Sequence, residues 1–283
     1  MNARTGLTLC ATLGLILGMS LSACNQQTPA PVPTALRQGV SPTEIRIGAS
    51  LPLSGHAAYL GQETLRGATA YFDYVNANGG VHGRKITLVA RDDGYDPPRC
   101  VANTQQLIID DKVFALSCYV GTPTTAKILP MLEEARIPLV GAFTGANALR
   151  DPFQRYVINV RPSYYQETAQ AVKHLVADLG IERIGVFYQY DAYGFDGLRG
   201  TELALKEFGL APVVRAMSPA TAPSMAQKRA RVAPHGLSGS ASAVIVISAG
   251  SSMWVSRPSM RASARCMFNR PGPQIRRSIE TRS

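Results

Sequence analysis

The feature that most constrains the fold is an unbroken strand–helix–strand pattern between residues 45 and 118. Alternating apolar residues predict a strand over 44–50, a helically spaced apolar stripe predicts a helix over 61–76, and a second strand follows over 85–91. The loop LPLSGHAAYLGQE joins the first strand to its helix. Open α/β sheets bind ligands at the carboxyl ends of their parallel strands, where such loops lie. This stretch therefore predicts a small-molecule crevice at the edge of a parallel sheet.

Predicted strands and helices continue to alternate to about residue 250, and this order predicts a doubly wound α/β fold. Residues 191–194 are expected to form a loop at the end of a strand. The further predicted strands are 113–118, 138–141, 156–160, 183–188 and 243–247, and the further predicted helices are 99–110, 125–136, 167–179 and 198–208.

Several short motifs in the first half resemble one family. They are LPLSG, the helix start Gly61-Gln62-Glu63, the segment N-x-x-GG-x-x-GRK-I from Asn76, and the loop DD-x-x-D from Asp92. Together they are similar to type I periplasmic solute-binding proteins, and most similar to the branched-chain amino-acid (leucine-type) receptors of ABC transporters. The resemblance covers roughly residues 42–220. It implies two doubly wound parallel-sheet lobes joined by a hinge, with lobe 1 over 44–160 and an incomplete lobe 2 over 161–250.

The N-terminus has the pattern of a secretory signal. Arg4 precedes an apolar run from Leu7 to Leu21, which is shorter than the ~20 residues of a spanning helix. Leu21-Ser22-Ala23-Cys24 resembles a bacterial lipobox, so we expect residues 1–23 to be a signal peptide and Cys24 to carry the lipid; an ordinary signal peptide cleaved elsewhere is the alternative. Residues 24–43 then form a polar, Pro-rich tether.

The net charge of +10 is concentrated near the C-terminus. Residues 226–283 hold ten of the 29 Lys and Arg residues but one acid, Glu280, and lack the interleaved aromatic residues that single-stranded nucleic acid requires. We therefore expect no nucleic-acid partner. Residues 251–283 show neither helical nor strand periodicity, which favours an aberrant or frameshifted terminus; a natural disordered basic tail is the alternative.

Two cysteines fall in the predicted folded part. Cys100 begins a predicted helix and Cys118 ends the next predicted strand, and both positions lie at the same rim of a parallel sheet. The pair could therefore approach the Cα separation of ~5–6 Å that a disulfide needs, and secretion would permit one. The leucine-type receptors likewise tie this helix to this strand. Two buried free thiols are the alternative.

The candidate ligand site comprises three loops that follow strand ends: 53–59, 119–124 and 142–146. They contain Ser54, glycines at 121 and 145, and threonines at 122 and 144. Free N–H groups at a helix start beside a hydroxyl suit a carboxylate, although such loops are also ordinary turns. The resemblance implies that Thr122, Thr144 and the neighbouring amides hold the α-carboxylate of a ligand.

Recognition of a ligand ammonium group requires an acid or an aromatic face. The resemblance places Tyr193 as an aromatic residue of lobe 2 that closes on the ligand, and Tyr59 is a second candidate in the first loop. The acid that pairs with the ammonium in the family comes from a later segment of lobe 2, which has no counterpart here.

The sequence gives little support for a catalytic site or a metal site. The sequence lacks the GxGxxG, P-loop, HExxH and GxSxG motifs, so we expect no catalytic residues and no cofactor. The four histidines at 56, 82, 174 and 235 lack metal-ligand spacing. Asp92, Asp93 and Asp96 lack the closing glutamate of a calcium loop, and a solvated loop is the favoured interpretation.

The sequence thus predicts a lipid-anchored extracytoplasmic receptor, not an enzyme. It would pass a small ligand, a (branched-chain) amino acid or related amide, to an ABC permease. A sensor or regulatory protein of the same fold, a non-functional truncated product and, more distantly, a secreted hydrolase are the alternatives.

Overall fold

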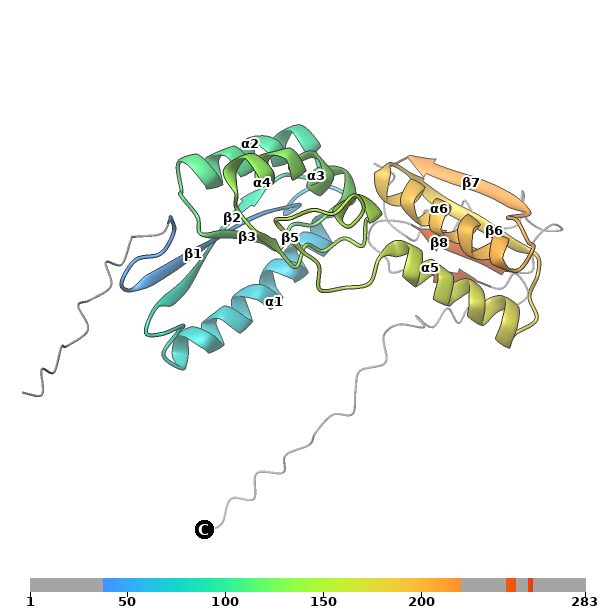
Figure 1. Ribbon diagram of the computed structural model, residues 1–283, viewed down its shortest axis with the longest axis horizontal. Coiled ribbons are helices and arrows are strands. Elements are labelled where there is room, and N and C mark those ends of the chain that lie inside the picture. The colour runs from blue at the N-terminus through green and yellow to red at the C-terminus, as the bar shows by residue number, and fades with distance from the viewer. Residues whose placement is uncertain (1–37, 220–242, 248–253, 257–283) are drawn as a thin grey trace, which may run out of the picture. The chain divides into compact units, whose positions relative to one another are not determined.

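The computed structural model describes residues 38–219, 243–247 and 254–256, and it shows two β-sheets connected by helices within one compact unit (Figure 1). The expected signal peptide, lipid-bearing Cys24 and most of the tether and basic tail lie outside the described residues.

The first sheet has five parallel strands in the order β2-β1-β3-β4-β5. This order confirms the predicted parallel α/β fold. The strands are β1 (Glu44–Leu51), β2 (Lys85–Asp92), β3 (Ala115–Ser117), β4 (Leu139–Val140) and β5 (Val157–Ile158). The helices between them are α1 (Ala58–Ala77), α2 (Pro97–Ile109), α3 (Thr122–Lys127) and α4 (Leu129–Ala135), followed by a 3-10 helix, Asn147–Leu149.

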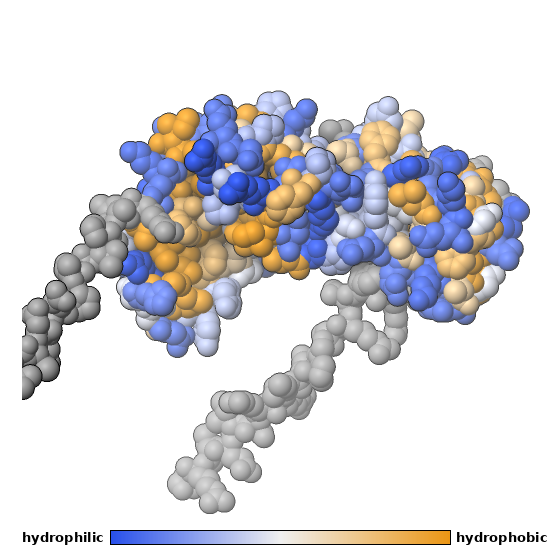
Figure 2. All heavy atoms as spheres, viewed as in Figure 1, coloured by the Kyte–Doolittle hydropathy of each residue, from blue (hydrophilic) through white to orange (hydrophobic). Residues whose placement is uncertain are grey.

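Helices cover both faces of this sheet (Figure 1). One face packs against α2, α3 and α4 in a core that includes Leu107, Leu116, Ile128 and Leu139. The other face packs against α1 in a smaller cluster around Leu51. On this side the helix buries only Gly61 among its own residues, and Figure 2 shows hydrophobic residues gathered over β1 and β3 beside α1.

The second sheet has the order β7-β6-β8-β9. Strands β6, β7 and β8 are parallel, and β9 pairs antiparallel with β8. Its elements are α5 (Tyr164–Lys173), a π-helical turn (His174–Asp178), β6 (Ile184–Tyr190), α6 (Ala192–Glu207), β7 (Val214–Pro219), β8 (Ala243–Ile247) and β9 (Trp254–Ser256). Three residues of the segment that the sequence analysis set aside as a tail therefore form a strand.

Capping residues define where the main helices begin. The carboxylate of Asp96 accepts a hydrogen bond from the Arg99 N–H at the start of α2, and Ser163 forms a capping box with Gln166 at the start of α5. Asp191 caps α6 by accepting from the Gly194 N–H. The expected loop over 191–194 is wrong beyond Asp191, because the helix begins at Ala192.

Candidate functional site

Two loops at the carboxyl ends of β3 and β4 lie side by side. Val120 and Phe143 form a parallel bridge, and the Phe143 N–H donates to the Tyr119 carbonyl at 2.7 Å. These contacts extend the pairing of the two strands beyond their assigned ends. The residues that follow, Thr122 and Thr144, are thereby brought to the same place at the edge of the sheet.

The two threonine hydroxyls form the centre of the candidate site. Their Oγ1 atoms lie 2.8 Å apart, and the side chains are 4% and 0% exposed for Thr122 and Thr144. The Thr144 Oγ1 also accepts from the Ala146 N–H at 3.2 Å and from the Tyr164 hydroxyl at 3.3 Å. The two hydroxyls thus satisfy one another, as buried polar groups must.

The predicted glycines 121 and 145 flank this pair. Gly121 has φ +115°, a left-handed conformation that favours glycine, and an added Cβ would lie 2.7 Å from the Tyr95 ring. At Gly145 an added Cβ would lie 2.8 Å from the Tyr164 ring. Both glycines therefore let a tyrosine approach the threonine loops closely.

Tyr164 contacts the hydroxyl pair, and Tyr193 packs against Tyr164. Tyr193, in the first turn of α6, packs edge-on against Tyr164 with ring centroids 5.0 Å apart. It contacts the main core of each sheet, and burial raises the pKa of its hydroxyl well above the usual range. Four predicted ligand residues are thus near neighbours, at positions 121, 122, 144 and 145, and Tyr193 reaches them through Tyr164.

An arginine that the sequence analysis did not single out lies beside the tyrosines. The Arg161 guanidinium lies 5.6 Å from the Phe143 ring centre and 5.4 Å from that of Tyr164, and it forms an ion pair with Glu167. Burial opposes its charge, but the hydrogen bond to Glu167 raises the pKa of Arg161 overall. The only feature of the sequence that pointed to Arg161 was its position before Pro162, where the chain enters the second sheet.

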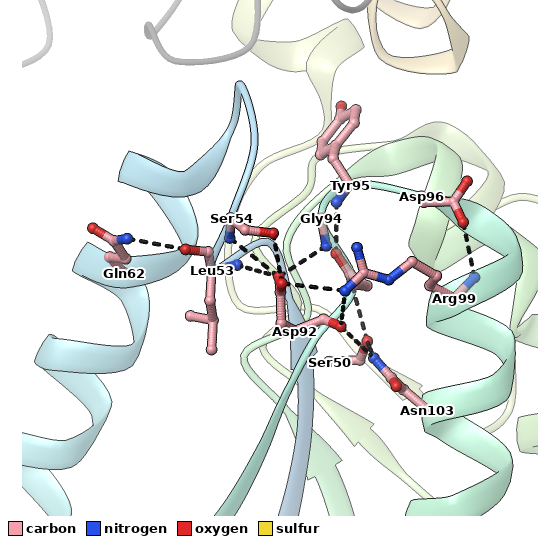
Figure 3. Close-up of polar contacts among 11 residues, drawn as sticks. Ser50, Leu53, Ser54, Gln62, Asp92, Gly94, Tyr95, Asp96, Arg99 and Asn103 are labelled. Atoms are coloured by element: carbon pink, nitrogen blue, oxygen red, sulfur yellow. Dashed lines mark hydrogen bonds and ion pairs between the residues drawn. The ribbon is translucent and has the colours of Figure 1, made fainter.

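Ser54 and Tyr59 lie in other surroundings. The Ser54 hydroxyl donates to the Asp92 Oδ2 at 2.6 Å, so its hydrogen is engaged by a carboxylate within the same sheet (Figure 3). Tyr59 lies in the first turn of α1 with 68% of its surface exposed, not among the buried residues around the threonines. The structure does not bring these two residues to the hydroxyl pair.

The three aspartates of the DD-x-x-D loop all accept hydrogen bonds within the protein, and Asp93 is the buried one among them. Asp92 accepts from the N–H groups of Leu53, Ser54 and Gly94 and pairs with Arg99 (Figure 3). Burial opposes its charge, but the Ser54 hydroxyl and these N–H groups lower the pKa of Asp92 to about 2.

Asp93 is fully buried, so the expected solvated loop is wrong for this residue. It accepts from the Ser50 hydroxyl at 2.8 Å and from the Tyr95 N–H at 2.9 Å. Burial raises its pKa despite these bonds. In the described part of the chain, no group of three or more His, Cys, Asp or Glu side chains is arranged to hold a metal ion.

The expected Cys100–Cys118 disulfide is not formed, and both residues are free thiols. Cys100 belongs to the core between the sheet and α2, whereas Cys118 packs in the cluster on the α1 face. Cys118 has φ +60°, which ends the alternation of β3 and turns its side chain away from Cys100. A position at the same rim of the sheet was therefore not enough for a disulfide, because the two cysteine side chains lie on opposite faces of the sheet.

Asp191 links the second sheet to these loops. It lies at the carboxyl end of β6, and its Oδ2 accepts from the Gln189 side-chain amide and, at 3.4 Å, from the Tyr95 hydroxyl. Tyr95 follows β2 and packs against His56 and Gly121. The first helical turn of α6 therefore faces the loops that carry the threonine pair, and α3 contacts α6.

None of the helices among residues 38–219 combines the length and apolar character needed to cross a membrane. The described residues thus form a site made of hydroxyls, tyrosine rings and one ion pair at the carboxyl ends of parallel strands. Such a set can bind a small polar ligand by hydrogen bonds and ring contacts.

Comparisons with known proteins agree with this arrangement. Residues 44–252 match the family described as periplasmic binding protein. A Leu/Ile/Val-binding protein homologue from Brucella abortus is 29% identical over 187 residues, which are 62% of this chain and 46% of that protein. This chain thus spans about half the length of the curated relatives it matches.

Solved structures show the same likeness. A possible leucine/isoleucine/valine-binding protein from Rhodopirellula baltica has 33% identity and a TM-score of 0.66, covering 76% of this chain and 57% of its own. A substrate-binding periplasmic protein from Ralstonia solanacearum has 36% identity and a TM-score of 0.65, covering 72% and 56%. These relatives are solute-binding proteins rather than enzymes, and the chain belongs to the periplasmic binding protein family.

Proposed function

We propose that this protein is an extracytoplasmic receptor that binds a small carboxylate ligand, with branched-chain amino acids as the first candidates, and delivers it to an ABC permease. Cys24 would carry a lipid that anchors the receptor to the membrane. The observation that carries the proposal is the buried Thr122–Thr144 hydroxyl pair at the carboxyl ends of β3 and β4.

The names of the relatives support a carboxylate. Those from Brucella are named Leu/Ile/Val-binding protein homologues, and a structural relative with 26% identity from Thermomonospora curvata is named a fatty acid ABC transporter substrate-binding protein. Amino acids and fatty acids share the carboxylate group. A pair of neutral hydroxyl donors is suited to that group, because each can turn its hydrogen toward an anionic oxygen.

Ligand capture would proceed by exchange of hydrogen bonds. The ligand carboxylate replaces the Thr122–Thr144 bond, so each hydroxyl donates to a charged oxygen instead of to its neighbour. Tyr164 and Tyr193 then pack against the rest of the ligand. Because these tyrosines lie on α5 and α6 of the second sheet, binding would draw the two sheets together, and this closure is what a permease can recognise.

The experiment is titration calorimetry of the purified protein with leucine, isoleucine, valine and simple carboxylates, supported by thermal unfolding. A ligand at 100 times its Kd should raise the free energy of unfolding by ~2.7 kcal/mol. Thr144→Val should abolish the response and Thr144→Ser should retain it. Failure of every carboxylate to bind would refute the proposal.

A further inference from the structure

We propose that Arg150 is a positioning residue for the ligand's carboxylate group, because it fastens the loop that carries Thr144 to the segment through which the chain enters the second sheet. This inference rests on the proposed function, since it names a residue that prepares the same site without touching the ligand. It is carried by the hydrogen bonds of one guanidinium group and by the contacts of the two peptide groups beside Thr144.

The bonds of Arg150 are the first step. Arg150 follows the 3-10 helix Asn147–Leu149 and is half-buried. Its Nη1 donates to the Ala146 carbonyl at 2.8 Å, and its Nη2 donates to the carbonyl of Arg161 at 2.8 Å and, at 3.4 Å, to that of Pro162. A guanidinium holds its donors in one planar fork, so it fixes the distance between the strand-end loop and the segment into the second sheet.

The peptide group between Ala146 and Asn147 is the second step, since it is held from both sides. Its carbonyl accepts from Arg150 at 2.8 Å, and its N–H donates to the Asp196 Oδ2 at 2.8 Å. Arg150 belongs to the connection between β4 and β5, whereas Asp196 lies on α6. Residues attached to different sheets therefore hold the same peptide group, and loss of either one leaves part of it without its bond.

The preceding peptide group, between Gly145 and Ala146, is also held at both ends. The Gly145 carbonyl accepts from the Tyr164 N–H at 2.8 Å, and the Ala146 N–H donates to the Thr144 Oγ1 at 3.2 Å. The two successive peptide groups share Ala146. A shift of the carbonyl that Arg150 holds would therefore also turn the N–H that reaches Thr144.

The Thr144 hydroxyl is the third step. Its Oγ1 accepts from the Ala146 N–H and from the Tyr164 hydroxyl, and a hydroxyl oxygen has two lone pairs. Both lone pairs are thus engaged, and the hydroxyl hydrogen is left to donate to Thr122 or to a ligand oxygen. A donor fixed in this way suits an anionic oxygen, so Arg150 favours carboxylate binding by keeping the Ala146 N–H in place.

The charge of Arg150 is held at a cost. Burial lowers the pKa of Arg150, and the neighbouring charge of Arg161 lowers it further. The hydrogen bonds of its guanidinium go to neutral carbonyl oxygens. Its place in the fold therefore follows from the geometry of those carbonyls, as expected of a residue that positions a loop.

The test is titration calorimetry on the full protein with leucine and with 4-methylpentanoate, which carries the same carboxylate but has no amino group. Arg150→Met removes every donor and keeps an unbranched side chain, so it should weaken the binding of either probe about tenfold or more. Arg150→Lys keeps the positive charge and some of the donors, so it should bind both probes at least about threefold more tightly than Arg150→Met.

A double variant separates positioning from a general structural role. Tyr164→Phe removes the other donor to the Thr144 Oγ1. If both residues act through this hydroxyl, combining Tyr164→Phe with Arg150→Met should cost clearly less affinity than the product of the two single losses. Losses that multiply in full would show that Arg150 acts elsewhere and would overturn the inference.

Arg155→Met is the matched control, since it makes the same charge change in the same segment, at an exposed arginine that lies over the Tyr156 ring. It should bind both probes as wild type does. If Arg150→Met does not unfold cooperatively, Arg150→Gln replaces it with the same expected loss, because a shorter neutral amide cannot bridge both carbonyls. Wild-type affinity in the Arg150 variant would overturn the inference and leave the proposed function standing. A wild-type protein that binds no carboxylate would contradict the proposed function itself.

Discussion

At the scale of single residues, Asp92 shows how a motif that suggests ligand chemistry can serve the scaffold. Its carboxylate ties the loop after β1 to the loop after β2 through Leu53, Ser54 and Gly94 (Figure 3). Ser54 was a reasonable ligand candidate from its place in the sequence. The structure assigns its hydroxyl to Asp92, and no pattern in the sequence distinguishes these two uses.

Asp92 should make the stability of the protein depend on pH. Its pKa is about 2 in the folded protein and about 3.9 in an unfolded chain. The stabilisation is therefore complete above about pH 4 and is lost as the pH falls toward 2. Asp92→Asn should lower the free energy of unfolding at neutral pH by about 1–2 kcal/mol, since solvent screens part of the effect.

The measurement is urea unfolding of wild type and variant between neutral pH and pH 2. The difference between their unfolding free energies should shrink below about pH 4. Asp73→Asn, an exposed acid on α1, should leave the curve of wild type unchanged. A difference that stays constant over the whole range would show that the charge of Asp92 does not stabilise the fold.

The same scale shows what residue patterns can predict about the site. Glycine and threonine after strand ends led to Gly121, Thr122, Thr144 and Gly145, because strand ends are readable from apolar alternation and the loops follow at once. Tyr164 and Arg161 were missed as site residues. Their importance depends on how the second sheet's helices meet these loops, which is a long-range contact that local pattern does not encode.

At the scale of elements, the sequence predicted the order of strands and helices well and two helix boundaries poorly. The expected helix over 125–136 is two helices, α3 and α4, because Pro130 lacks an N–H and obstructs the turn before it. Helix α6 begins six residues before the expected 198, in a glycine-rich segment. Gly197 there packs against Ile247, where an added Cβ would lie 2.7 Å from that side chain, so tertiary packing overrides weak helix propensity.

The turn into α3 gives a prediction at this scale. Gly121 has φ +115°, and an added Cβ would lie 2.7 Å from both the Thr124 hydroxyl oxygen and the Tyr95 ring. Gly121→Ala should therefore destabilise the protein by about 1–3 kcal/mol and weaken ligand binding, because it displaces the loop that carries Thr122. Thermal unfolding and calorimetry would measure the two effects.

Gly67→Ala is the matched control for this substitution. Gly67 lies inside α1, and an added Cβ there would meet nothing within 4 Å. Alanine should stabilise this helix by up to about 1 kcal/mol. A Gly121→Ala protein as stable as wild type would mean that the loop relaxes freely, and the argument from close approach would fail.

At the scale of the whole molecule, the two sheets have separate cores that meet at few places. Leu116 and Leu139 lie in the core of the first sheet, and Val186 and Ile245 in that of the second. Tyr193 contacts both cores. Further links run from Tyr95 to Asp191, from the Tyr164 hydroxyl to Thr144, and from the Asn147 N–H to the Asp196 Oδ2, at 2.8 Å. A fold of this kind places its polar links around the ligand site, where closure can be coupled to binding.

Asp196 should therefore affect the closure of the two sheets on the ligand without contacting the ligand itself. Asp196→Ala leaves the Asn147 N–H without its acceptor, so the closed form loses stability and affinity should fall about tenfold. The loss should be equal for leucine and for its desamino analogue, 4-methylpentanoate, because the lost bond lies within the protein. Asp196→Asn should restore most of the affinity by supplying an amide oxygen in the same place. An Asp196→Ala protein that bound both ligands as tightly as wild type would show that the bond between Asn147 and Asp196 does not support closure.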